Sequence, residues 1–148
     1  MTKNQHLIIF ALRIALGILF LYSGISKIIN PDFTAAGFIG AAQSLKPLYA
    51  WFATPVALPS INILNSWGQA AIGLSLVSGL FVRYSSIAGI LMMVMYYFPG
   101  LHFPYVGKSG LLIDDHIIYI LVFLIFISCN SGRFWGLDHF ITKKSTQE

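Results

Sequence analysis

Residues 7–29 read LIIFALRIALGILFLYSGISKII, and this run carries only two charged side chains, Arg13 and Lys27. A helix needs about 20 mostly apolar residues to cross the roughly 30 Å hydrocarbon layer of a bilayer, so the run is long enough to span a membrane. A cleaved signal peptide is the alternative for an apolar segment near the N-terminus. The length of the run, its internal arginine and the lack of a small-residue cleavage site after it favour a retained helix.

The composition of the chain agrees with a membrane protein. Of its 148 residues, 57% are hydrophobic and 9% are charged, whereas soluble domains usually carry about a quarter charged residues. No hydrophilic stretch is long enough to form a separate domain. We therefore expect a single membrane domain over residues 1–148, whose net charge of +4 is a topology signal rather than a nucleic-acid-binding surface.

Three further segments have the apolar character of membrane spans, at about 65–82, 84–99 and 111–130. The joins between them are short, so successive spans are expected to be antiparallel neighbours. The predicted fold class is therefore all-α: an integral-membrane four-helix bundle.

Residues 31–60 connect the first two spans and contain four of the six prolines. The prolines cut this segment into units that are too short to span. Asp32 is a suitable N-cap for a short helix at about 33–44, and the aromatic side chains around Trp51 suit the headgroup region of a bilayer. We expect short interfacial helices that cover one end of the bundle.

The lysines and arginines indicate the orientation of the bundle. Four crossings place the N-terminus, the turn near residue 83 and the tail at 131–148 on one side of the membrane. That side carries Lys3, Arg83, Arg133, Lys143 and Lys144, and the other side carries Lys27, Lys46 and Lys108. Because cytoplasmic loops are enriched in positive charge, we expect both termini in the cytoplasm.

Charged and small residues share one face of the first helix, because they recur at steps of three and four: Arg13, Gly17, Phe20, Gly24 and Lys27. Glycines let helices approach closely, and a charge in hydrocarbon costs about 2.5 to 3.5 kcal/mol on insertion scales. We therefore expect this face to line the interior of the bundle. The alternative is that both charged side chains snorkel to the nearest membrane surface.

Polar groups gather near the outer end of the bundle, opposite the termini. On the fourth helix, Asp115, His116 and Tyr119 share a broad face, whereas Asp114 points elsewhere and is well placed as the N-cap. An ion pair between Asp115 and Lys27 is the expected way to neutralise both charges. Gln69, Tyr96 and Tyr119 belong to the same outer layer.

This layer predicts a small-molecule or quinone pocket lined by aromatic side chains. A histidine near a carboxylate titrates close to neutral pH, as a proton relay for quinone chemistry requires. The candidate catalytic residues are Asp115, His116 and Lys27, and candidate substrate-binding residues include Gln69, Tyr96 and Tyr119. The competing interpretation is that the charged residues only cap helices, that the glutamine only bonds a neighbouring helix and that Tyr96 belongs to an interfacial belt.

The sequence offers no metal, haem, flavin or iron–sulfur ligand set. Its single cysteine, Cys129, excludes dithiol chemistry within the chain. Quinone is therefore the one cofactor that we predict, and the electron-donor chemistry is expected to come from a partner redox subunit.

Four stretches together resemble the DoxX/DoxD family of small four-helix membrane proteins: LRIALGILFLYSGISKIINP, PDFTAAGFIGAAQ, NSWGQAAIGLSLVSGLFVRYSSIAGILMMVMYY and DDHIIYILVFLIFISCNSGRFWGLD. The likeness covers about residues 7–139, and the AAGF and GRFWGLD segments are most similar to DoxD, a membrane subunit of thiosulfate:quinone oxidoreductase. The resemblance implies a plasma-membrane protein that acts in a redox system with a partner. It carries over these positions as site candidates: Ser23, Gly24, Lys27, Asp115, His116 and Gly136.

Three functions follow from these observations. The first is an integral-membrane redox component that binds quinone and acts as a subunit of a quinone-dependent oxidoreductase. The second is a non-catalytic membrane scaffold for a redox enzyme, in which Lys27 and Asp115 serve packing. The third is a small transporter, which at four helices requires a homo-oligomer to build alternating access.

Overall fold

The computed structural model describes residues 2–107 and 110–139, and it is mostly helical. Helix α1 (Lys3–Ile28) begins earlier than the predicted residue 7, because Thr2 and Gln5 form a capping box at its start. Its buried residues include Arg13, Gly17 and Gly24. The prediction that this face points to the interior is therefore confirmed.

The second long helical run covers residues 58–78 without a break, as α4 (Leu58–Ile63), a π-helical turn (Leu64–Gly68) and α5 (Gln69–Ser78). The predicted start at residue 65 was wrong. Pro59 lies in the first turn of α4, where its missing N–H is not needed and its fixed φ suits a helix. The expected interfacial segment at 31–60 therefore ends earlier than predicted. The run stops at Gly79, which adopts a positive φ of 72°.

The third and fourth helices are α6 (Val82–Tyr97), which continues as a 3₁₀ turn (Phe98–Gly100), and α7 (Asp115–Ser128). Helix α7 starts at Asp115, whereas the predicted span starts at about residue 111. Asp114 is its N-cap and accepts hydrogen bonds from the backbone of His116 and Ile117, so the predicted cap is confirmed.

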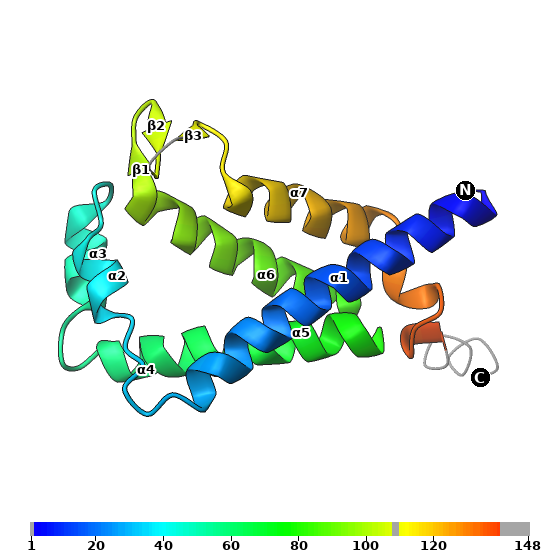
Figure 1. Ribbon diagram of the computed structural model, residues 1–148, viewed down its shortest axis with the longest axis horizontal. Coiled ribbons are helices and arrows are strands. Elements are labelled where there is room, and N and C mark those ends of the chain that lie inside the picture. The colour runs from blue at the N-terminus through cyan, green and yellow to red at the C-terminus, as the bar shows by residue number, and fades with distance from the viewer. Residues whose placement is uncertain (1, 108–109, 140–148) are drawn as a thin grey trace.

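A small antiparallel sheet joins α6 to α7 and was not predicted. Its strands are β1 (Leu101–His102), β2 (Tyr105–Val106) and β3 (Gly110–Leu111), in the order β1-β2-β3. In Figure 1 the sheet projects beyond the helices at one end of the molecule.

Two short helices cover the same end, which we call the lid end: α2 (Ala36–Gly40) and α3 (Lys46–Phe52). Short interfacial helices were expected here, but the boundaries differ. Asp32 does not cap α2; the N-cap is Ala35, whose backbone N–H donates to Asn62 Oδ1 at 2.8 Å. The buried Tyr49 of α3 donates its hydroxyl to the carbonyl of Met95 at 2.8 Å, which ties the lid to α6.

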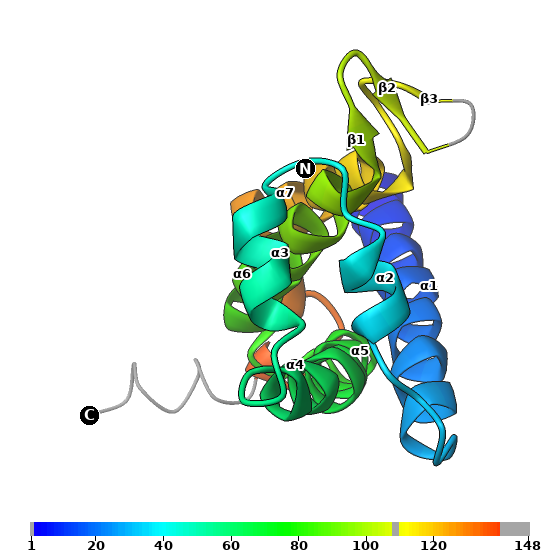
Figure 2. The same ribbon diagram turned by 90° about the vertical axis from the view of Figure 1, so that its left-hand side faces the viewer.

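The long helices form two closely packed pairs, α1 with α5 and α6 with α7, while α5 and α6 touch less extensively. Figure 1 shows α1 crossing α5, and Figure 2 views the molecule from the lid end. Glycines allow the first pair to approach: a Cβ on Gly73 would lie 2.3 Å from the backbone N of Leu21. The core between the pairs consists of Leu16, Phe20, Ile72, Leu76, Val82, Met93, Phe123 and Phe126.

Within residues 2–107 and 110–139, α1 is the helix long and apolar enough by itself to cross a membrane, and α7 is a shorter apolar helix. The predicted tail at 131–148 is described as far as His139, where it includes a short 3₁₀ turn (Ser131–Arg133). Lys108, Lys143 and Lys144, which entered the orientation argument, lie outside the described residues.

Candidate functional site

A hydrogen-bonded polar cluster lies at the lid end of α1, where this helix packs against the π-helical turn. The half-buried Lys27 donates from Nζ to Asn65 Oδ1 at 2.8 Å and to Gln69 Oε1 at 2.5 Å. Ser23 Oγ also donates to Gln69 Oε1, at 3.1 Å. Tyr96 of α6 donates its hydroxyl to Asn65 Oδ1 at 2.6 Å. Four predicted site residues therefore meet in one network.

The centre of this network is Asn65, which the sequence analysis missed. Its amide oxygen accepts from both Lys27 and Tyr96, and so it links α1 to α6. Asn65 lies in the π-helical turn Leu64–Gly68, and such turns occur frequently at functional sites. An asparagine among apolar residues near a predicted helix start was the available signal, but it also fits an ordinary cap.

The predicted ion pair between Asp115 and Lys27 was wrong. Among residues 2–107 and 110–139, the Lys27 ammonium contacts the two amide oxygens and the rings of Phe33 and Tyr96, each with its centroid 5.7 Å away. Asp115 is exposed on the first turn of α7. The ammonium is therefore held by neutral acceptors and aromatic faces.

His116 pairs with Asp114 rather than with Asp115. Its Nδ1 lies 2.6 Å from Asp114 Oδ2, and the same carboxylate caps α7. The prediction that Asp114 points away from the histidine was therefore wrong. The imidazole meets the ring of Tyr96 edge-on, with centroids 5.9 Å apart. Tyr96 thus lies between the Asp114–His116 pair on one side and Asn65 on the other.

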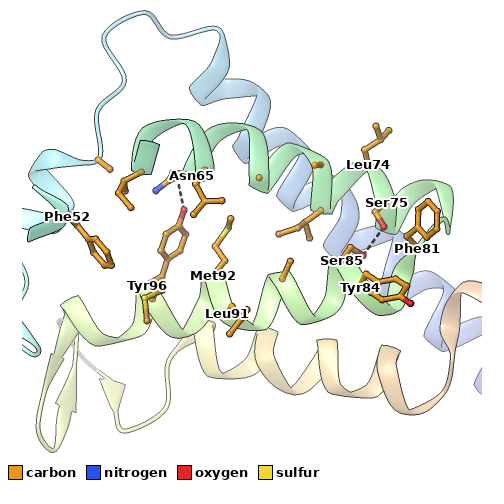
Figure 3. A pocket seen from close by; sticks show the side chains of 18 of the residues that line it. Phe52, Asn65, Leu74, Ser75, Phe81, Tyr84, Ser85, Leu91, Met92 and Tyr96 are labelled. Atoms are coloured by element: carbon orange, nitrogen blue, oxygen red, sulfur yellow. Dashed lines mark hydrogen bonds between the residues drawn. The ribbon is translucent and has the colours of Figure 1, made fainter. Parts of the chain in front are cut away.

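A cavity of about 1020 Å³ opens between the 58–78 run and α6, and α2 and α3 close its lid end. Figure 3 shows Asn65 and Tyr96 bonded to each other near Phe52, and Ser75 bonded to Ser85 farther along, at 2.8 Å. Between these two polar pairs the wall is apolar. Its residues include Ile61, Leu64, Ala71, Ile72, Ala88, Leu91, Met92 and Met95.

The other predicted site residues do not line this cavity. Lys27 lies on the far side of Asn65 from the cavity, where it binds both Asn65 and Gln69. Gly24 packs against α5, where an added Cβ would lie 2.4 Å from the backbone N of Ala70. Tyr119 faces the core and meets Phe20 edge-on at 6.2 Å.

Arg13 forms a second polar centre near the middle of α1 (Lys3–Ile28). It is fully buried and donates to the backbone carbonyls of Ser131, Phe134 and Trp135. The snorkelling alternative is therefore wrong for this residue. Gly136 lies beside the guanidinium, since an added Cβ would be 3.0 Å from Arg13 Nη1. This places Gly136 in the packing of the C-terminal loop, away from the cavity.

The DoxX family model matches residues 8–100. The chain belongs to the DoxX family. DoxX proteins are typically membrane-bound and are often linked to redox systems, so this chain is a membrane-associated protein. The match includes Ser23, Lys27, Asn65 and Tyr96, and it ends before α7 and the GRFWGLD segment. The similarity to DoxD therefore stays a prediction. No match was found among curated proteins, and none among solved structures.

Within the part of this DoxX chain that the structure describes, no group of three or more His, Cys, Asp or Glu residues could hold a metal ion. The chemically active groups of the cluster are an ammonium, a phenol and an imidazole–carboxylate pair. Together they can donate hydrogen bonds, provide a positive charge and hold a proton.

Proposed function

We propose that this DoxX protein is an integral-membrane four-helix bundle forming one domain, with spans α1, residues 58–78, α6 and α7. The 58–78 run is about 31 Å long at 1.5 Å per residue, which matches the hydrocarbon thickness. Large apolar side chains are exposed on all four spans, which is costly in water and favourable in lipid. Examples are Leu19, Ile25, Leu74, Ile87, Leu91, Leu121 and Leu124.

Within this bundle, we propose that the cavity between α5 and α6 binds a membrane quinone. The observation that carries this proposal is the lining of the cavity: a long apolar wall with the hydrogen-bonded Asn65–Tyr96 pair near its lid end. The wall suits an isoprenoid tail, and the polar end suits a quinone ring oxygen. Ligand sites of this kind combine apolar walls with a few polar groups that fix orientation.

The residues at the polar end have distinct proposed roles. The Tyr96 hydroxyl, which donates its single proton to Asn65 Oδ1 in this structure, turns to donate it to a quinone ring oxygen, and the Lys27 ammonium, which also binds Asn65 Oδ1, supplies positive charge from behind. His116, against the Tyr96 ring and paired with Asp114, holds a proton close to the site. When bound, a quinone supplies two-electron, two-proton acceptor chemistry. The electrons are expected from a partner redox subunit of a DoxD-like quinone-dependent oxidoreductase.

Quinone retention by purified protein tests this proposal. The protein is extracted in mild detergent, loaded with a membrane quinone, and the bound quinone is measured by chromatography. Tyr96→Phe removes the donor to the ring oxygen, and we expect about three- to tenfold weaker binding, the usual effect of one lost hydrogen bond. Tyr84→Phe is the matched control, because Tyr84 lines the far end of the same cavity.

A second variant tests the apolar wall. Ala88 lines the middle of the cavity, so Ala88→Trp should fill it and abolish quinone binding while the thermal unfolding temperature stays within a few degrees. If the wild type binds no quinone, or if both wall and polar-end variants bind as the wild type does, the quinone proposal is rejected. The scaffold function would then account for the protein better.

A further inference from the structure

A second cavity lies at the end of the bundle where α1 begins, about 36 Å along α1 from Lys27 at 1.5 Å per residue. Its volume is about 510 Å³. The first two turns of α1 provide one wall and the C-terminal loop provides the other. The lining residues are Lys3, His6, Ser78, Arg133, Phe134, Trp135, Gly136, Leu137 and His139.

The loop wall of this cavity is held in place by several independent contacts. Arg13 binds three of its carbonyls. The backbone of Leu137 donates to Ser78 at 3.2 Å, and the ring of Phe134 stacks on His6 with centroids 4.0 Å apart. These contacts tie the loop to both α1 and α5. The loop wall of the cavity is therefore held in a fixed position by the fold.

The charges that face this cavity are of one sign. Lys3 and Arg133 line it from opposite walls, and neither side chain has an ion-pairing or hydrogen-bonding partner among residues 2–107 and 110–139. Among the residues that the structure describes, no acidic one lines it. The carboxylate of Asp138, in the C-terminal loop, accepts from the backbone of Phe81 and Val82 at the start of α6. The two cationic side chains are thus left to bind an anion.

The surface next to these cations is apolar and exposed. Trp135 is 58% exposed and Leu137 is 46% exposed, and both also line the cavity. Cationic groups beside an exposed tryptophan are typical of the membrane–water interface. Basic pockets on the cytoplasmic side of membrane helices commonly bind anionic lipid headgroups.

We propose that this cavity binds a phosphate group through Lys3 and Arg133, as the headgroup of an anionic phospholipid or as a soluble phosphate. Arg133 presents a planar guanidinium that suits phosphate oxygens, and Lys3 adds a second positive charge. The adjoining Trp135 and Leu137 contact acyl chains when the phosphate belongs to a lipid. The site is separate from the quinone cavity.

The test measures binding of delipidated full-length protein to vesicles of phosphatidylglycerol, to vesicles of phosphatidylcholine and to inorganic phosphate. We expect phosphatidylglycerol to bind at least tenfold more tightly than phosphatidylcholine. The double variant Lys3→Gln/Arg133→Gln should lose this preference, because each cation near a lipid surface contributes roughly a fivefold increase in affinity. Both side chains are exposed, so the variant should unfold at the wild-type temperature.

Two control variants remove charge elsewhere. Lys46→Gln removes an exposed lysine at the lid end, and Lys143→Gln/Lys144→Gln removes two charges from the tail. Both should keep the preference. Competition by millimolar inorganic phosphate would assign the site to soluble phosphate, and its failure to compete would assign it to lipid. Equal binding of the two lipids without phosphate binding, or a preference that only the tail variant removes, would overturn the proposal.

Discussion

Arg13 and Lys27 lie on the same face of α1, and each is satisfied by neutral oxygen atoms. Arg13 binds three backbone carbonyls of the C-terminal loop, and Lys27 binds the side-chain amides of Asn65 and Gln69. These hydrogen bonds offset the cost of burying a cation, although Arg13 Nε has no hydrogen-bond partner among the described residues. Arg13 thus ties the middle of α1 to the C-terminal loop and Lys27 ties its last turn to the 58–78 run, and neither has an acidic hydrogen-bonding partner among the described residues.

Replacing Arg13 should destabilise the protein strongly. Arg13→Met leaves three buried or partly buried carbonyls without their donor, and we expect a loss of about 3 kcal/mol in the free energy of unfolding, measured by denaturant titration in detergent. Arg13→Lys should recover only part of this loss, because a lysine lacks the planar fork of donors. Arg83→Met is the control, since Arg83 is exposed. Equal stability of the two methionine variants would contradict the role given to Arg13.

Replacing Lys27 should affect quinone binding more than folding. Lys27→Met removes the positive charge behind Asn65, and we expect about tenfold weaker quinone binding, since hydrogen bonds to charged groups contribute about 1.5 to 3 kcal/mol. Lys27→Arg should retain most of the affinity. Lys46→Met, which removes an exposed lysine from α3, should bind quinone as the wild type does. Unchanged binding by Lys27→Met would remove this residue from the site.

At the scale of the helices, close contact between α1 and α5 depends on glycine. In Gly73→Ala the new Cβ would lie 2.3 Å from the backbone N of Leu21 and 2.6 Å from its Cα. Backbone atoms cannot rotate away, so the helices must separate, and overpacking of this kind costs about 1–3 kcal/mol. Gly40→Ala is the control, because nothing lies within 4 Å of the added Cβ there. Circular dichroism melts of both variants in detergent measure the difference, and a shared melting temperature would contradict this packing.

The sequence predicts features within one helix better than contacts between helices. The buried face of α1 follows from the spacing of Arg13, Gly17 and Gly24, because helical periodicity alone places them together. The partners of Lys27 are the amide oxygens of Asn65 and Gln69 on the 58–78 run, and they meet Lys27 because of how this run packs against α1. Spacing within one helix does not contain this information, and an ion pair with Asp115 was therefore predicted wrongly.

Backbone interactions explain the remaining differences. The three carbonyls that bind Arg13 and the two-residue strands β1 to β3 involve main-chain atoms, which leave little trace in the side-chain pattern. Pro59 was interpreted as a break between units, although a proline in the first turn starts a helix as readily as it ends one.

For the whole molecule, four spans predict that both ends of the chain lie on the same side of the membrane and that the lid end lies on the other. In a Cys129→Ser background, Lys46→Cys should react with an impermeant maleimide in intact spheroplasts. Thr2→Cys should react only after the membrane is opened, because positive charge favours a cytoplasmic N-terminus. Labelling of both positions from one side would contradict the arrangement of spans.

The most direct test of the central claim is photolabelling in native membranes with an azido-quinone, followed by peptide mass spectrometry. The account predicts labels on the α5 and α6 residues that line the larger cavity, such as Ala71, Met92 and Met95, with competition by unlabelled quinone and loss in Ala88→Trp. Labels confined to the outer surface of α1 and α7, or labels that unlabelled quinone does not displace, would contradict it.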